Sequence, residues 1–258
     1  MVRGLYTAWT GMSNEQKRLD IISNNLANSA TVGYKKEGVT NQSFDEVLTM
    51  RVRDNSNKAG DSSMVGTMSL GVKLGEVYTD YSQGSLRETG NTYDLSMEGN
   101  GFFTLSVVDK NGNENTRYTR SAQFVMDKEG YIVDVNGNHL VSESGKLQVP
   151  TDAGKVMIDV DGSVYADGQL VDKLVVKDFE DYDYLKKYGD TMYSAEQGAQ
   201  EIDAKGSVRQ GFTEQSNVNV VNEMVNLIAI TRAYEANQKV IQSIDGTLEL
   251  AANSVGKL

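Results

Sequence analysis

Apolar residues recur every seven positions at both ends of this 258-residue chain, and that spacing constrains the fold more than any other feature. The N-terminal series comprises Leu5, Met12, Leu19 and Leu26, with Ala8 and Ile22 three residues after two of them. The C-terminal series comprises Val220, Leu227, Tyr234, Ile241, Leu248 and Val255, accompanied by Ile230, Ile244, Ala251 and Leu258. A seven-residue period keeps one apolar seam turned toward a partner helix. We therefore expect two terminal helices that pack against each other or against copies of the chain.

The composition excludes several classes of function. A net charge of −11 offers no basic surface to phosphate groups, so we expect no nucleic-acid partner. No apolar run approaches the roughly 18 residues that span a bilayer, and polar residues between Asn14 and Asp20 interrupt any secretory signal. Cysteine is absent and His139 is the single histidine, which leaves no thiol chemistry, histidine triad or multi-histidine metal site. We expect no membrane insertion, cofactor, metal or catalytic residue.

The pattern along the chain predicts an α+β fold with four regions. Residues 1–50 form an N-terminal helical segment, with the helix running to about residue 30, and residues 51–71 read as a polar linker or extended arm. Residues 72–210 alternate with a period of two, which is typical of an antiparallel β-rich domain. Residues 211–258 form a C-terminal helix, with Ser216 or Asn217 as its N-cap, that pairs with the first helix as a coiled coil.

Turn dipeptides separate the short strands of the middle region. They are Asn111-Gly112, Asn136-Gly137, Asp161-Gly162 and Asp167-Gly168. Asn and Asp tolerate positive φ angles, and glycine adopts them freely, so these dipeptides suit two-residue hairpin loops. We expect type I′ turns at all four places.

Three separated motifs resemble those of bacterial flagellar axial proteins. The first is SNNLANSATVGYKK, residues 23–36. The second begins at Thr89-Gly90-Asn91, continues through Asp94-Leu95 and ends at Gly101-Phe102-Phe103. The third runs from Ser216-Asn217-Val218-Asn219 to Arg232-Ala233-Tyr234-Glu235-Ala236-Asn237. Their order and positions cover most of the chain, and its length favours the basal-body rod proteins of the family, with the distal rod type preferred over the neighbouring proximal type.

The resemblance implies a structural subunit that polymerises with its own copies into a hollow helical shaft, which transmits torque from motor to hook. It implies terminal helices inside the shaft and the β domain outside. Implied partners are other flagellar rod and hook proteins and the gate of the flagellar type III export apparatus. The implied location is the flagellar basal body outside the cytoplasmic membrane, reached as an unfolded chain without a Sec signal peptide.

Residues other than the apolar series are also candidates for assembly. Asn24, Asn25 and Asn28 can end the first helix while bonding to neighbouring groups, although a solvated helix end would look the same. Gly33 permits a turn that a Cβ atom would resist, and Tyr34 follows it.

Two further candidates have weaker signals. Asn237 falls on the C-terminal seam between Ile230 and Ile244, where a polar side chain can set register, or it is exposed. Phe44 and Leu48, four residues apart, resemble the site that the export gate reads in early export substrates, a spacing that any amphipathic turn also produces.

Two alternatives to a rod subunit are compatible with the composition. One is an exported hydrolase that uses a pair of carboxylates, although no Asp or Glu pair stands in a motif. The other is an exported monomeric binding module with a helical stalk. The hydrolase gives the two heptad series at the ends of the chain no purpose.

Overall fold

The computed structural model describes residues 2–50, 64–109 and 112–255. The contacts of the chain divide it into two compact units. The helical unit contains Met1–Leu26, Glu37–Tyr78 and Val220–Leu258, and the β unit contains Ala27–Lys36 and Thr79–Asn219. The chain therefore passes between the units several times, and each unit is built from segments distant in sequence.

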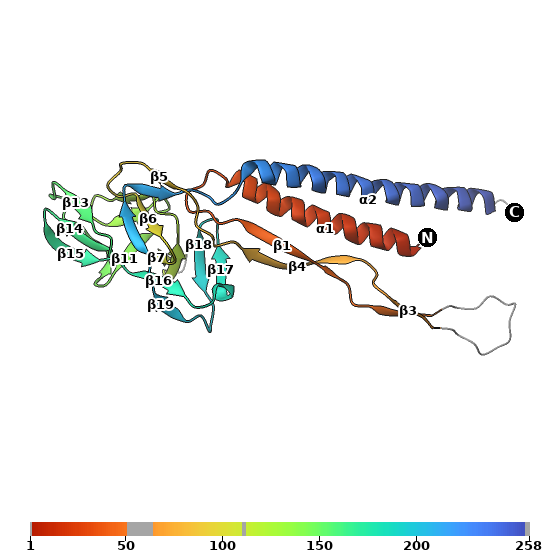
Figure 1. Ribbon diagram of the computed structural model, residues 1–258, viewed down its shortest axis with the longest axis horizontal. Coiled ribbons are helices and arrows are strands. Elements are labelled where there is room, and N and C mark those ends of the chain that lie inside the picture. Colours follow the sequence, from red (N-terminus) through yellow and green to blue (C-terminus); the bar gives the residue numbers. More distant parts are fainter. Residues whose placement is uncertain (1, 51–63, 110–111, 256–258) are drawn as a thin grey trace. The chain divides into compact units, whose positions relative to one another are not determined.

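Two long helices dominate the helical unit, α1 (Val2–Ala27) and α2 (Val220–Val255). They lie side by side and antiparallel, with the first turn of α1 and the last turn of α2 at the same end of the pair (Figure 1). A Cβ atom placed on Gly4 would lie 3.6 Å from Ile244, and one placed on Gly11 would lie 3.1 Å from Asn237. Gly4 and Gly11 are seven residues apart on α1, as Asn237 and Ile244 are on α2. The two glycines let the helices approach closely at both points. The two predicted terminal helices are thus confirmed, and no described helix is long and apolar enough to cross a membrane.

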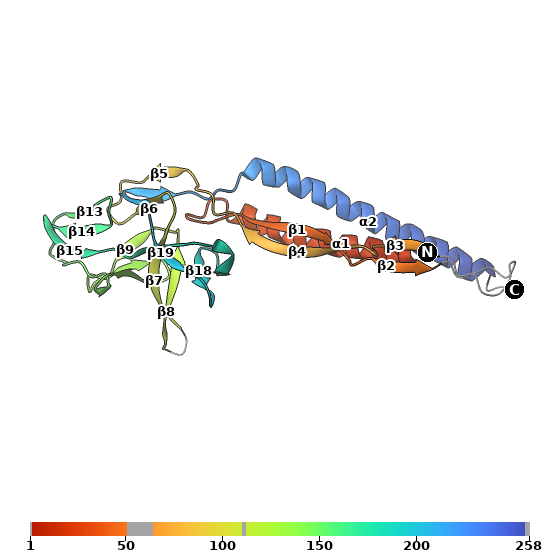
Figure 2. The ribbon, with the colours of Figure 1, turned by 60° about the horizontal axis from the view of Figure 1, so that its bottom comes forward.

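An arm of strands completes the helical unit. Strand β1 (Glu37–Ser43) pairs with β4 (Val72–Thr79), and β2 (Val47–Met50) pairs antiparallel with β3 (Met64–Met68) (Figure 2). Residues 51–63 of the expected linker lie outside the described residues, and residues 64–68 of it form β3. The chain's contacts group β4 with the helices, while the expected domain boundaries at residues 50, 71 and 210 stay predictions.

The β unit confirms the antiparallel β-rich middle. Its largest sheet has ten strands and contains the path β17-β18-β8-β7-β11-β10-β9, with β12, β16 and β19 paired beside it. A three-stranded sheet has the order β13-β14-β15, and two further pairs are β20-β6 and β21-β5. The strand bounds are β5 (Leu86–Glu88), β6 (Leu95–Glu98), β7 (Phe102–Val108), β8 (Glu114–Thr119), β9 (Phe124–Met126), β10 (Ile132–Asp134), β11 (His139–Ser142), β12 (Gly145–Lys146), β13 (Val156–Ile158), β14 (Ser163–Ala166), β15 (Gln169–Lys173), β16 (Val176–Phe179), β17 (Leu185–Tyr188), β18 (Met192–Ala195), β19 (Glu201–Asp203), β20 (Ser207–Gln210) and β21 (Phe212–Glu214).

Strand β7 separates two hydrophobic cores. Successive side chains of a strand point to opposite faces, so Phe103 and Leu105 enter the larger core while Phe102 enters a second, aromatic one. The aromatic core also contains Tyr118, Phe179, Leu185 and Tyr193. Phe102 and Phe103 are both fully buried. Both faces of the strand are buried at this point, and even the polar Thr104 between Phe103 and Leu105 is only 4% exposed.

The hairpin turns correct part of the sequence prediction. Among the described non-glycine residues only Asp167 has a positive φ, 49°, so the Asp167-Gly168 loop alone has the backbone signature of type I′. At Asn136-Gly137 only the glycine is left-handed, and the amide of Gly137 bonds back to Asp134. Asp161-Gly162 behaves likewise. The type I′ prediction is wrong at both places, because a type I turn followed by a glycine bulge adds one residue to the loop. Asn111 lies outside the described residues.

Two tyrosine hydroxyls in or beside the aromatic core bond to carboxylates, Tyr118 to Glu201 and Tyr182 to Asp178. Burial, reinforced by the carboxylate, raises the pKa of Tyr118 above its ordinary value and that of Tyr182 to about 12. A group whose pKa is higher in the folded state contributes stability that is lost as pH rises from the unfolded pKa through the folded one. The β unit should therefore lose stability between about pH 10 and 12.

Tyr182→Phe is expected to make that alkaline loss shallower. The variant should cost about 1 kcal/mol at pH 8 through the missing hydrogen bond, and the gap to wild type should shrink as pH approaches 12. Urea unfolding at pH 8, 10 and 11.5, followed by near-ultraviolet circular dichroism, measures this. Tyr184→Phe, at a ring 44% exposed, is the matched control and should follow wild type. An unchanged pH slope in Tyr182→Phe would contradict the assignment.

Candidate assembly site

The inward face of α2 is a continuous seam at alternating spacings of three and four residues. It consists of the buried or half-buried side chains Glu223, Leu227, Ile230, Tyr234, Asn237, Ile241 and Ile244. This spacing is the coiled-coil pattern, in which each step returns the chain to the same side of the helix. Asn237 is half-buried and faces Gly11, so it lies in the seam and is not an exposed residue.

The seam does not include every residue of the predicted series. On α1, Leu5, Met12, Leu19, Ile22 and Leu26 are half-buried and Ala8 is buried. On α2, Val220 is 36% exposed and Leu248 38% exposed within one chain. The side chain of Val255 lies outside the described residues. One subunit therefore covers the middle of its own seams and leaves the ends of α2 accessible.

Among the residues that the structure describes, none covers a second apolar surface of α2. Val221, Met224, Val225 and Ile228 are 70%, 49%, 60% and 52% exposed, and we call these four residues the outer patch. Their spacing over two turns places them on one side of the helix, away from Leu227 and Ile230. Exposed apolar surface gathered on one face of a helix is typical of a protein–protein contact.

A polar face of α1 binds the arm. The Asn25 amide group donates from Nδ2 to the Glu37 carbonyl at 2.8 Å and accepts from the Glu37 N–H at 2.9 Å. The Thr7 hydroxyl donates to the Leu70 carbonyl, and Asn14 Nδ2 donates to Asn41 Oδ1 at 3.1 Å. Asn25 thus substitutes for a backbone partner and satisfies both polar groups of Glu37, which explains its complete burial.

The turn after α1 uses the other residues of the first motif. The helix ends at Ala27, three residues before the expected end, and the Asn28 side chain accepts a bond from the Thr31 hydroxyl at 3.0 Å. Asn24 is exposed. Gly33 has φ 72° and lies against the backbone of Ser121, and the buried Tyr34 ring is capped by the Lys187 ammonium at 4.3 Å.

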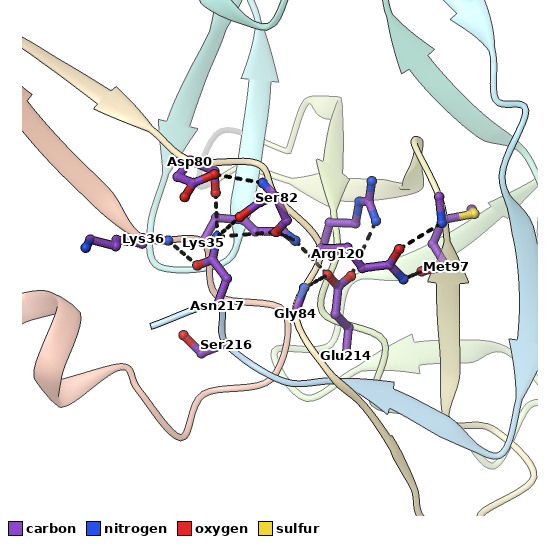
Figure 3. A network of polar contacts seen from close by, with 12 residues as sticks. Lys35, Lys36, Asp80, Ser82, Gly84, Met97, Arg120, Glu214, Ser216 and Asn217 are labelled. Atoms are coloured by element: carbon purple, nitrogen blue, oxygen red, sulfur yellow. Dashed lines mark hydrogen bonds and ion pairs between the residues drawn. The ribbon is translucent and has the colours of Figure 1, made fainter. Parts of the chain in front are cut away.

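A buried charge cluster lies next to this turn in the β unit (Figure 3). Glu214 accepts from Lys35 Nζ at 2.6 Å and pairs with Arg120 at 3.4 Å, and all three side chains are at most 3% exposed. The Gly84 N–H also donates to Glu214, at 2.8 Å, while Lys35 donates to the Ser82 carbonyl. The cluster therefore ties the segment after α1 to three other parts of the chain.

Burial and charge compete at this cluster. Burial lowers the pKa of Lys35, and the neighbouring Glu214 carboxylate offsets only part of that effect. Two cations share the Glu214 carboxylate, so removing it would leave two buried positive charges with only the weaker effect of Asp80 on Lys35 to offset them. The Arg120 guanidinium also lies 5.1 Å from the centre of the Phe102 ring, which provides a second favourable contact.

The segment before α2 is held by Asn217. Its Oδ1 accepts from the Lys36 N–H at 2.8 Å, and its Nδ2 donates to the Asp80 carbonyl at 2.8 Å (Figure 3). The helix begins only at Val220, so the prediction of Ser216 or Asn217 as N-cap is wrong. Asn217 forms the bonds just described, and Ser216 Oγ accepts a hydrogen bond from the Val218 N–H.

The proposed export residues lie in the arm. Phe44 is half-buried, and its N–H donates to the Gly71 carbonyl, while Leu48 lies in β2 and is 43% exposed. In the folded chain this segment forms no helical turn, so the four-residue spacing has no shared face there. Its recognition by an export gate stays a prediction about the unfolded chain.

Sequence reasoning missed the roles of Lys35, Arg120 and Glu214. Charged residues in an alternating strand pattern are expected at the surface, and nothing in their local spacing separates these three from solvated ones. It also missed the buried polar face of α1, where Thr10 and Asn14 are at most 4% exposed. A repeat of small polar residues at positions 7, 10 and 14 was the available signal.

Comparisons with known proteins agree with this architecture. Residues 5–35 match the family described as flagella basal body rod protein, residues 96–166 the flagellar hook protein FlgE/F/G D1 domain, and residues 209–254 the flagellar basal body rod FlgEFG protein C-terminal family. Flagellar basal-body rod protein FlgG of Bacillus subtilis is 32% identical, over 98% of this chain and 99% of its own length. Flagellar basal-body rod protein FlgF of Caulobacter vibrioides is 31% identical, over 100% of this chain and 98% of its own length. Flagellar hook-basal body complex protein FlhO of Bacillus subtilis is 29% identical, over 100% of both.

Proposed function

The chain belongs to the flagellar basal-body rod protein family and is a structural rod subunit, and from this premise we propose that it builds the rod by polymerising with copies of itself. The terminal helices form the intersubunit contacts as well as the pair within each subunit. The alternatives of a carboxylate hydrolase and a stalked binding module gain no support from relatives named as rod proteins. We further propose a position in the distal rod, with other rod and hook proteins as neighbours, and the 32% identity to a FlgG protein supports it.

The observation that carries the proposal is the outer patch. Its four apolar side chains are about half exposed or more in one chain, although α2 already has an internal partner on its other side. Burying one such side chain contributes about 1.5–3 kcal/mol. A subunit that covers this patch with a neighbour gains that stabilisation only in the polymer, which favours assembly over an isolated monomer.

Val225→Asp combined with Ile228→Asp is expected to prevent polymerisation without unfolding the chain. Both positions are more than half exposed, so the monomer loses little packing. Loss of two apolar contacts costs the interface about 3 kcal/mol or more, which raises the critical concentration by about two orders of magnitude. Sedimentation of the purified protein over a concentration series, with electron microscopy of the pellets, measures the effect.

Val135→Asp is the matched control, because Val135 is 75% exposed in the β unit and outside the patch. It should polymerise like wild type. Polymers of normal critical concentration from the double variant would exclude the outer patch from the interface. Failure of wild type to form any ordered polymer would contradict self-assembly itself.

Transport of the chain to the basal body by the flagellar type III apparatus is a further part of the proposal. It is supported by the family and by the absence of cysteine, since no disulfide can form before the chain is threaded. Transmission of torque then follows from the mechanics of a shaft whose subunits bury their seams in concert.

A further inference from the structure

A pocket lies along α1 in the single chain. It has a volume of about 160 Å3 and lies between α1 and the arm, with Trp9, Ser13, Asn14 and Lys17 on the helix side and Phe44 and Lys73 on the other. All of these residues belong to the helical unit. We call it the α1 pocket. Its volume suits a single side chain.

An unpartnered polar atom points to an occupant. Asn14 is 3% exposed, and its Oδ1 has no hydrogen-bond partner among the described residues, although its Nδ2 is bonded to Asn41. A buried acceptor without a donor costs about 1–3 kcal/mol. A water held in the pocket beneath an occupant can donate to this oxygen and remove that cost.

The rim of the pocket has the composition of a binding site. Trp9 is 53% exposed and Tyr6 beside it 48%, with ring centres 6.0 Å apart. Large exposed aromatic side chains concentrate binding energy at protein interfaces. Two lysines, Lys17 and Lys73, line the pocket, and among the described residues no carboxylate does. The pocket is therefore cationic in a chain whose net charge is −11.

One surface of the same chain has the complementary chemistry. The C-terminal part of α2, residues 240–254, contains Asp245 and Glu249 and no Lys or Arg. We call it the α2 tail. It also exposes Leu250 at 69% and Val240 at 47%. The apolar side chains of the α2 tail can pack on the aromatic rim of the α1 pocket, and its carboxylates carry the charge opposite to that of the two lysines.

We propose that the α1 pocket receives the α2 tail of a second copy of this chain, with Leu250 against Trp9 and Glu249 near Lys17. The inference rests on the proposed self-assembly and assigns the two surfaces that meet. Pocket and tail are different surfaces, so the contact is heterologous. A heterologous contact that does not close on itself repeats as an open helical polymer, which is the geometry a shaft requires.

The absence of cysteine makes a direct test possible. Ser13→Cys and Leu250→Cys are prepared as two single variants and mixed under polymerising conditions with a mild oxidant, so any disulfide between them joins two chains. Cross-linked Ser13→Cys/Leu250→Cys pairs should form at least about tenfold faster than controls, because contact raises the local thiol concentration to roughly millimolar. The controls are Ser13→Cys with Val225→Cys, in the outer patch, and with Val135→Cys, in the β unit.

Several results would overturn the inference. Faster cross-linking to Val225→Cys would assign the pocket to another part of α2, and a dominant Ser13→Cys homodimer would mean a two-fold contact. Equal rates in all mixtures would remove the α2 tail as occupant, leaving a different protein or water in the pocket. Lys17→Glu should slow the specific cross-link, and Glu249→Lys on the Leu250→Cys partner should restore it; failure of that rescue would exclude the charge pairing.

Sedimentation of wild type in the same buffer distinguishes a failure of the pocket assignment from a failure of self-assembly. Ordered polymers without the specific cross-link would refute the pocket assignment and leave self-assembly standing. No polymer at any concentration would refute self-assembly and the pocket assignment together.

Discussion

Glu214→Gln is expected to lower the free energy of unfolding of the β unit by about 3–5 kcal/mol, because it leaves the buried Lys35 and Arg120 without the carboxylate with which both form ion pairs. Both cationic side chains are at most 3% exposed, so water compensates little of their charge. The glutamine oxygen can still accept the Gly84 N–H, so the loss reports mainly on charge. Urea unfolding at pH 7, followed by near-ultraviolet circular dichroism of the tyrosines, measures it.

Two variants make the result specific. Glu98→Gln removes a carboxylate whose pair with Arg209 is 47% and 48% exposed, and it should cost less than about 1 kcal/mol. Lys35→Met removes one cation and leaves a balanced Arg120–Glu214 pair, so its loss should be smaller than that of Glu214→Gln. Equal losses in Glu214→Gln and Glu98→Gln would show that burial does not govern this cluster.

Gly33→Ala should have the second large effect, a loss of about 2–5 kcal/mol from left-handed strain and overpacking together. The residue has φ 72°, and a Cβ atom there would lie 2.3 Å from the Ser121 amide nitrogen and 2.5 Å from the Arg120 carbonyl carbon. Both contacts are with backbone, which cannot rotate away. The displaced residue, Arg120, belongs to the charge cluster, so strain at the turn disturbs the ion pairs as well.

Gly90→Ala provides the control for backbone conformation. Its φ is 69°, nearly that of Gly33, but a Cβ atom there would meet nothing within 4 Å. It should therefore show the conformational cost alone, about 1–2 kcal/mol. The difference between the two variants, measured by the same urea unfolding, isolates the close approach of Gly33 to residue 121. A difference near zero would mean that the turn can move without cost.

The single tryptophan allows the two units to be followed separately in these experiments. Trp9 lies in α1 and reports on the helical unit through its fluorescence, whereas most tyrosines lie in the β unit. Glu214→Gln and Gly33→Ala are both changes in the β unit. Their effect on the tyrosine signal should therefore exceed their effect on the Trp9 transition.

The sequence by itself determined the two terminal helices, the antiparallel β-rich middle and the family, because these depend on patterns local to each segment. A seven-residue apolar period specifies a helical seam wherever it occurs, and alternation of period two specifies a strand with one buried face. The motif around Asn25 and Gly33 was also visible, although its bonds were not. The type of each turn could not be predicted from the sequence, since Asn-Gly and Asp-Gly dipeptides occur both in type I′ loops and in loops that end in a glycine bulge.

Only the tertiary structure decided which charges are buried and which apolar surfaces stay open. Lys35, Arg120 and Glu214 are 85 and 94 positions apart in sequence, and their ordinary surface chemistry becomes a buried cluster only because three distant segments converge. Burial is a property of what lies around a side chain and has no local signature. For the same reason the sequence could place Asn14 on a helix but could not show that its buried side-chain oxygen has no donor among the described residues, or that it lines a pocket.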